Sequence, residues 1–171
     1  MPLYLVSHAQ DLTDEQRDRL AQGITKIHTS IFTAPSLFVN VRFSPASQYV
    51  GYVGGKRSTV SSITGHVRHG PSRTQVMYDE LTSSISKLWA ETVESDRDIR
   101  IFIMGDIVAG YEQGVSLPPA GGDKVWLKNN LPYFEKKAAE GNQQMKDLLE
   151  EIKERKLLDW SPVADEIVRK E

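Results

Sequence analysis

The 171-residue sequence contains no cysteine, and this absence limits the chemistry that it can support. It excludes disulfide bonds, thiolate nucleophiles and thiolate metal sites, and it fits a reducing compartment. Long apolar runs are also missing, because none approaches the roughly 20 residues of a membrane-spanning helix. The first residues lack the basic and then apolar pattern of a secretory signal peptide. We therefore expect a cytoplasmic protein that does not bind membranes.

An excess of charge of one sign is absent as well. The 21 lysine and arginine residues nearly balance the 23 aspartate and glutamate residues, so the composition does not indicate a broad positively charged surface for nucleic acid. With 39% hydrophobic and 26% charged residues, the composition is that of an ordinary globular protein. Its length suits one domain, or a domain with an extension. We expect no nucleic-acid partner, and any recognition of an anion must depend on a few local residues.

The first half of the chain predicts a strand, a helix and a second strand. Residues 2–8 form an apolar, strand-like run that Pro2 opens, and residues 13–16 match a capping box that starts a helix. Apolar residues then recur at helical spacing: Leu20, Ile24, Ile27 and Ile31. Alternation over residues 37–43 predicts the second strand. Glycines among β-formers in residues 49–55 predict a short hairpin or an irregular strand.

The second half repeats this plan. Residues 59–67 and 99–104 predict strands, and a second capping-box pattern at residues 72–75 predicts a helix between them. The helical stripe consists of Met77, Leu81, Ile85 and Leu88. Two strand–helix–strand units with short links predict two right-handed βαβ units in one sheet, with both helices on one face. We therefore predict an α/β (α+β) domain over residues 1–122.

A charged, largely helical extension is predicted for residues 123–171. The loop at residues 117–122, rich in proline and glycine, separates it from the repeated units. An apolar stripe follows at Met145, Leu148, Leu149 and Ile152, and Ser161-Pro162 matches a further helix start. Because the polar face mixes both charge signs, we expect the stripe to pack on the same domain or on a neighbouring subunit rather than on a membrane.

Pro2 is the first candidate for chemistry. If Met1 is removed, which a small, rigid second residue favours, Pro2 presents a secondary amine at the start of a strand. A free α-amino group titrates near pH 8, and apolar walls or nearby cations lower its pKa. Such an amine can act as a general base, a general acid or an imine-forming nucleophile. From this stretch alone, however, an ordinary second residue is the simpler interpretation.

Two arginines are candidates for binding an anion. Arg68 falls at the end of a predicted strand, and Arg73 falls in the first turn of the next helix if Ser72 is its cap. Free backbone N–H groups and the helix dipole favour an anion there, and two guanidinium groups suit a carboxylate. Either arginine alone is more often a solvated surface charge.

His28 and Glu112 complete the set of candidates. His28 lies beside the apolar stripe of the first helix, and Glu112 lies in a glycine-flanked segment that can present a carboxylate to a cleft. Alone, His28 is more often a partly buried structural histidine. The histidines do not match a metal pattern, since His66 and His69 would point to opposite faces of a strand. Without a phosphate-cradling glycine loop or a nucleophile elbow, we expect neither metal nor cofactor.

Taken together, these features resemble a known family. Pro2, the two βαβ units and residues 24–28 (Ile-Thr-Lys-Ile-His) are similar to the tautomerase superfamily, specifically its cis-3-chloroacrylic acid dehalogenase branch. The resemblance extends to about Gly121 and includes residues 50–55 and 112–118. In this order and spacing the motifs are fairly specific. The resemblance implies a homotrimer with one proline site in each chain.

The resemblance also assigns roles to the candidates. In that branch the amino-terminal proline is the acid/base, a histidine and two arginines hold the substrate carboxylate, and a tyrosine and a glutamate activate water. Carried over, Pro2 and Glu112 are catalytic, whereas His28, Arg68 and Arg73 bind a small carboxylic acid substrate.

Two departures from the branch shape the expected reaction. Ile103 occupies the position of the water-activating tyrosine, and the link between Arg68 and Arg73 is two residues longer than the branch pattern. Because isoleucine cannot hydrogen-bond, we expect tautomerisation, an isomerase reaction, to exceed hydration or dehalogenation, a hydrolase-like reaction. Tyr4 or Tyr111 could replace the missing hydroxyl. The alternative is a non-catalytic binding or signalling protein on the same fold, as in macrophage migration inhibitory factor.

Overall fold

The computed structural model describes residues 2–93 and 99–159. The helix start expected at Ser161-Pro162 lies outside these residues. No helix in the described part of the chain is long and apolar enough to cross a membrane.

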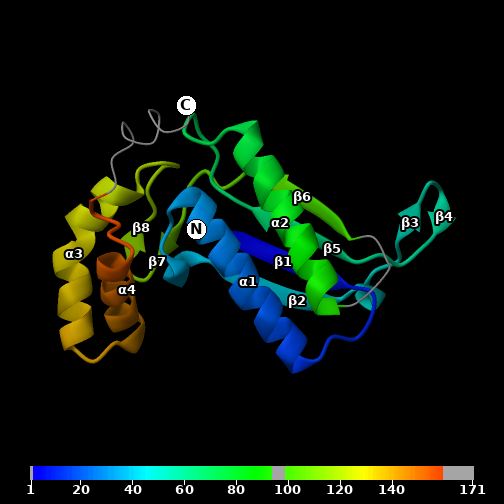
Figure 1. The fold of residues 1–171 in the computed structure, drawn as a ribbon, viewed down its shortest axis with the longest axis horizontal. Helices are drawn as coiled ribbons and strands as arrows, with labels where there is room; N and C mark the ends of the chain where they lie inside the picture. Colours follow the sequence, from blue (N-terminus) through cyan, green and yellow to red (C-terminus); the bar gives the residue numbers. More distant parts are fainter. Residues whose placement is uncertain (1, 94–98, 160–171) are drawn as a thin grey trace.

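A four-stranded sheet forms the centre of the protein (Figure 1). In order across the sheet, the strands are β2 (Asn40–Pro45), β1 (Leu3–His8), β5 (Ser62–His66) and β6 (Arg100–Met104). Strand β1 runs parallel to β2, β5 runs parallel to β6, and the two pairs meet through the antiparallel contact of β1 with β5. Each parallel pair is joined through a helix, so the prediction of two βαβ units is confirmed.

Helices α1 (Asp14–Phe32) and α2 (Gln75–Val93) cover one face of the sheet (Figure 1). Buried and more exposed side chains alternate along β1 and β5, so one side of these strands is buried beneath the helices. The fully buried residues of this core are Tyr4, Val6, Leu20, Ile24, Ile63, Leu81 and Ile85. The two helices approach closely at Gly23, where an added Cβ would lie only 2.5 Å from a Leu88 methyl carbon.

The two helices begin differently. Thr13 and Gln16 form the expected capping box of α1, with hydrogen bonds of 3.2 and 3.0 Å. The cap expected at Ser72 for α2 is wrong. The backbone N–H of Arg73 donates to the carbonyl of Gly70, which makes a turn first, and Thr74 then accepts from the backbone of Met77. Arg73 therefore precedes the helix rather than lying in its first turn.

Two small hairpins leave the sheet. Strands β3 (Tyr52–Val53) and β4 (Lys56–Arg57) form the predicted hairpin, joined by two glycines with positive φ, and this hairpin projects beyond the end of the sheet (Figure 1). Strands β7 (Tyr111–Glu112) and β8 (Val115–Ser116) form the other. Glu112 therefore lies in a short paired strand, between Gly110 and Gly114.

The predicted strand at residues 37–43 begins later than expected. A 3₁₀ turn, η1 (Ser36–Phe38), precedes β2, and a second, η2 (Ala46–Gln48), follows it. The turn at η1 directs Phe38 away from the sheet and into a second apolar core.

This second core belongs to the extension. Helices α3 (Asp123–Ala139) and α4 (Gln143–Glu154) pack side by side, next to β7 and β8 (Figure 1). Its buried members are Phe38, Leu127, Phe134, Ala138, Met145, Leu148, Ile152 and Leu157. All except Phe38 come from the extension. We refer below to residues 2–122 as the body and to residues 123–159 as the extension.

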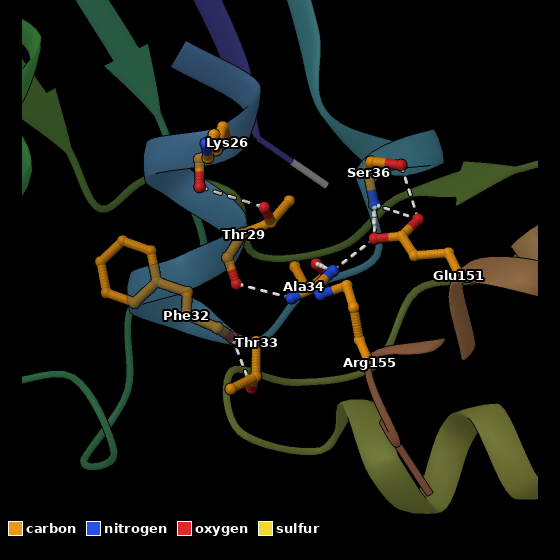
Figure 2. A network of polar contacts seen from close by, with 8 residues as sticks. All are labelled: Lys26, Thr29, Phe32, Thr33, Ala34, Ser36, Glu151 and Arg155. Carbon is orange, nitrogen blue, oxygen red and sulfur yellow. Dashed lines mark hydrogen bonds and ion pairs between the residues drawn. The ribbon is translucent and has the colours of Figure 1, made fainter. Parts of the chain in front are cut away.

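Polar contacts anchor α4 to the end of α1 (Figure 2). Glu151 accepts hydrogen bonds from the backbone and the hydroxyl of Ser36. Arg155 pairs with Glu151 and donates to the carbonyls of Thr29 and Ala34 at 2.8 and 3.1 Å. A cation is favourable beside the carbonyl end of a helix. The carbonyl groups of the last turn of α1 have no N–H partner within the helix, and Arg155 donates a hydrogen bond to that of Thr29.

Candidate active site

The candidate site lies where β1 begins, between the body and the extension. Pro2 is buried there and lines a small cavity together with Arg68. Phe38 and the loop before α3 close the body side of this cavity, while Asp123 and Trp126 of α3 close the other. Its volume is about 10 Å³, which is barely the space of one water molecule.

Arg68 follows strand β5 and is held by three acceptors. One terminal nitrogen donates to the carbonyls of Pro118 and Pro119 at 2.8 and 3.0 Å. The other donates to the carboxylate of Asp123 at 2.8 Å. The Arg68 and Asp123 side chains are only 6% and 9% exposed, so this is a buried ion pair. The arginine expected to bind a substrate is therefore already bound to a carboxylate of its own chain.

Arg73 lies next to Arg68, as expected, but contacts different groups. Its guanidinium donates to the backbone carbonyl of Arg68 at 2.6 Å and stacks over the ring of Phe32, 4.1 Å from the ring centre. Burial, and then the charge of Arg68, lower the pKa of Arg73. The link between the two arginines is longer than in the resembled branch, but the turn between Gly70 and Arg73 shortens the distance that it spans. The Arg73 side chain therefore still contacts Arg68.

His28 is fully buried in α1 and hydrogen-bonded to Tyr4. The Tyr4 hydroxyl lies 2.8 Å from Nδ1 of His28. Burial raises the pKa of Tyr4, whereas burial and then the charge of Arg73 hold the pKa of His28 well below its usual range. Both groups are therefore neutral near pH 7. When the tyrosine donates to Nδ1, the ring proton resides on Nε2, which has no partner among the described residues.

Glu112 is linked to Pro2 through Asn40. The Asn40 side chain donates to Glu112 Oε1 at 3.4 Å, and its backbone N–H donates to the Pro2 carbonyl at 3.0 Å. Burial raises the pKa of Glu112, while the Asn40 hydrogen bond and the positive charge of the amino terminus oppose that rise. Oε2 is buried and lacks a partner within the described part of the chain. This carboxyl is suited to exchanging a proton.

The tyrosines considered as replacements at Ile103 have other partners. Ile103 is partly buried in the first core, and its Cδ1 would lie 2.9 Å from a Cβ added at Gly65, beside Tyr4. The Tyr4 hydroxyl contacts His28. Tyr111 is 74% exposed and donates to the Gly114 carbonyl at 2.9 Å. Neither hydroxyl is free to orient water.

The structure thus places Pro2 and Arg68 at one cavity and Arg73 beside Arg68, and it connects Glu112 to Pro2 through Asn40. His28 reaches Arg73 through Phe32, whose ring centre lies 4.9 Å from that of the histidine. Sequence reasoning missed Asp123 and Asn40, since neither matches a motif. Within residues 2–93 and 99–159, no group of three or more histidine, aspartate or glutamate side chains is arranged to hold a metal ion.

Comparison with known proteins connects this geometry to a family. Residues 1–131 match the model of the tautomerase family described as "Putative oxalocrotonate tautomerase enzyme". A search of curated proteins finds no match. The expected resemblance to about Gly121 is confirmed, and the family match continues into α3.

Solved structures share the fold. N1, a member of the cis-3-chloroacrylic acid dehalogenase family, is 23% identical with a TM-score of 0.59, over 74% of this chain and 90% of its own. A protein of the thermophilic fungus Aspergillus fumigatus is 25% identical with a TM-score of 0.56, over 76% and 94%.

An asymmetric trimer named a fused 4-OT is 21% identical with a TM-score of 0.55, over 67% and 94%. The fold of this chain is therefore that of the tautomerase superfamily, with a helical C-terminal extension. The chain belongs to the tautomerase family that its first 131 residues match.

Proposed function

We propose that this protein is a cofactor-independent enzyme in which Pro2, freed by the removal of Met1, performs acid/base chemistry on a small unsaturated or 2-oxo carboxylic acid. One observation carries the proposal. Pro2 and Arg68 line one buried cavity, and a single residue, Asn40, is hydrogen-bonded to both Pro2 and Glu112. A buried amine beside cations has a lowered pKa, which favours its neutral, basic form.

The proposed reaction is a keto–enol transfer. The neutral Pro2 amine takes the proton of an enol hydroxyl and returns it to carbon, so the substrate becomes the 2-oxo acid. Arg68 and Arg73 bind the substrate carboxylate, and the Nε2–H of neutral His28 donates a further hydrogen bond. Glu112, whose pKa burial raises, is not needed for this transfer and would instead activate water in a hydration or dehalogenation.

Tautomerisation is proposed over hydration or dehalogenation because of the residue at Ile103. Hydration needs a water molecule that is oriented and deprotonated, and in this chain Glu112 would have to do this alone. Acid–base assistance by one positioned group typically contributes 10²–10⁴-fold, so its loss is severe for hydration. Keto–enol transfer needs only the proline and the groups that bind the carboxylate.

We also propose that the protein is a cytoplasmic homotrimer. The trimer named among the structures that share its fold supports this assembly. Leu5, Phe102 and Met104 are exposed on strands β1 and β6, away from the helices, where a neighbouring subunit would cover them.

The test compares variants in two assays. Intact mass should reveal the loss of Met1, and Pro2→Ala should lower tautomerisation of a phenylenolpyruvate-type acid by about 10²-fold or more. Glu112→Gln should largely spare tautomerisation and abolish dehalogenation of cis-3-chloroacrylate. Ile103→Tyr should raise dehalogenation if the side chain at this position faces the cleft. A protein that keeps Met1 and is fully active does not use Pro2 as its amine.

A second candidate is a binding protein without catalysis. The cavity of about 10 Å³ and the occupied guanidinium of Arg68 favour it. Equal rates for the unmodified protein and Pro2→Ala, at the background level for every acid tried, would support this candidate.

A further inference from the structure

The cavity at Pro2 contains a carboxylate that belongs to the protein. Asp123 is the first residue of α3, and it lies 55 residues from Arg68 in the sequence. The 2.8 Å hydrogen bond between Arg68 and the Asp123 carboxylate has the length of a charge-assisted bond. Such a bond is what Arg68 would make to the carboxylate of an acid substrate.

The Arg68 N–H group that holds Asp123 is not available to a substrate carboxylate while this bond lasts. The other contacts of Arg68 are to the carbonyls of Pro118 and Pro119, in the loop that leads into α3. A cavity of about 10 Å³ has no space for an acid of several heavy atoms. For a small acid to reach Pro2, the loop and the start of α3 must therefore move away from Arg68.

The structure contains the features that such a movement needs. Gly121, with φ of +82°, and Gly122 lie directly before α3, whose first turn has no side-chain cap. Glycines at the end of an element absorb changes of backbone angle at low cost. The Glu151 and Arg155 contacts join the end of α4 to Thr29, Ala34 and Ser36 and involve neither the loop nor α3, so α4 can remain docked (Figure 2).

We propose that Asp123 determines which ligands the Pro2 site accepts, because its carboxylate competes with the substrate carboxylate for Arg68. This inference rests on the proposed function, since it takes Arg68 as the substrate's binding partner. The closed form lowers the apparent affinity of every acid by the fraction of molecules that are open. A ligand without a carboxylate gains nothing at Arg68 and does not displace Asp123.

Asp123→Asn is the direct test, with acrylate as the probe and acrylamide as its uncharged counterpart. The variant keeps the shape of the side chain but exchanges a charge-assisted bond to Arg68 for a weaker neutral one. Calorimetry should show that acrylate binds about tenfold more tightly to Asp123→Asn than to the unmodified protein. Acrylamide should bind to neither of these two proteins.

Glu135→Gln is the control variant, because it removes one negative charge from an exposed position of α3. Its affinity for acrylate should equal that of the unmodified protein. Equal or weaker binding of acrylate by Asp123→Asn would overturn the proposal.

A second measurement needs no variant, because loss of one partner of a buried ion pair can prevent folding. Trp126 lines the cavity, and its indole N–H donates to the Ser116 carbonyl at 2.6 Å. In the unmodified protein, saturating acrylate should shift the NMR resonance of this indole N–H, and acrylamide should leave it unchanged. An indole resonance that does not respond to acrylate would also overturn the proposal.

These measurements separate this inference from the proposed function. Binding of acrylate is recorded without turnover. Tighter binding by Asp123→Asn in a protein whose activity does not depend on Pro2 would contradict the proposed function alone. Activity that depends on Pro2, together with unchanged acrylate binding in Asp123→Asn, would contradict the role of Asp123 alone.

Discussion

The body and the extension are both built around apolar cores, but they differ in how they are joined. The core of the body consists of inward-facing side chains of β1 and β5 against α1 and α2. The core of the extension consists of residues of α3, α4 and the segment after α4, with Phe38 as its single buried contribution from the body. Apolar burial therefore stabilises each region largely through its own core, and their interface combines polar contacts with the partly buried Leu37, Val115 and Leu117 of the body.

The buried charged groups gather at this interface. Arg68 and Arg73 come from the body, and Asp123 comes from the extension. A buried ion pair is weak evidence for stability, because desolvation offsets most of the attraction. An apolar contact would join the two regions at least as firmly. This ion pair is consistent with the anion binding proposed above, and the two cores predict different responses to substitution in the two regions.

The largest difference is expected between the two cores. Ile85→Ala in the body and Leu148→Ala in the extension each remove a fully buried aliphatic side chain, which typically costs about 2–5 kcal/mol. Ile85→Ala should lower the free energy of global unfolding. Leu148→Ala should loosen the extension first, since its core is separate.

Hydrogen exchange of backbone amides distinguishes these responses. In Leu148→Ala, protection should fall in α3 and α4 while β1 and β5 keep theirs, whereas Ile85→Ala should lower protection in both regions. A uniform loss of protection in Leu148→Ala would mean that the two cores form one cooperative unit.

A smaller effect is expected at the polar anchor of α4. Arg155→Ala removes the donors to the Thr29 and Ala34 carbonyls and the partner of Glu151. Hydrogen bonds that involve a charged group contribute about 1.5–3 kcal/mol, and partial exposure of Arg155 places the expected loss toward the lower end. Urea unfolding measures it, with the exposed Lys153→Ala on α4 as the control. Equal midpoints for both variants would show that Arg155 does not stabilise the interface.

Much of the body was predictable because local patterns govern it. The alternation of β1 and the spacing of Leu20 and Ile24 depend on near neighbours in the sequence, and the capping box at Thr13 lies within one turn. The N-cap of α2 was predicted at the wrong residue because Ser72 and Thr74 are both residue types that cap helices. The turn closed by Arg73 and Gly70 decides between them, and its formation depends on the tertiary contacts of Arg73.

The site was only partly predictable, for a related reason. The resemblance indicated Pro2, His28 and the arginines, and the fold places Pro2 with Arg68, and Arg73 beside Arg68, while His28 reaches Arg73 through Phe32. The partner of Arg68 could not be predicted, since Asp123 is distant in sequence and any of the 23 acidic residues could have filled that place. That Tyr4 contacts His28 also depends on how α1 crosses β1, which residue spacing does not determine.

The last predicted effect concerns pH and depends on His28, which is buried and neutral among charged groups. Burial and the charges of Arg73 and Arg68 lower the pKa of His28 in the folded protein, while in the unfolded chain it titrates near about 6.5. As the pH falls through that value, the unfolded state binds a proton that the folded state does not, so the folded state loses stability by up to about 1.4 kcal/mol per pH unit. Burial raises the pKa of Glu112, so its contribution to stability is present at low pH and is lost as the pH rises. It therefore acts in the opposite direction to that of His28.

Urea unfolding between pH 7.5 and 5 measures this effect. The free energy of unfolding should fall more steeply for the unmodified protein than for His28→Gln, whose side chain cannot take up a proton and retains an acceptor for Tyr4. Parallel curves would mean that folded His28 is protonated as readily as the unfolded chain, and that it does not provide a neutral donor beside Pro2.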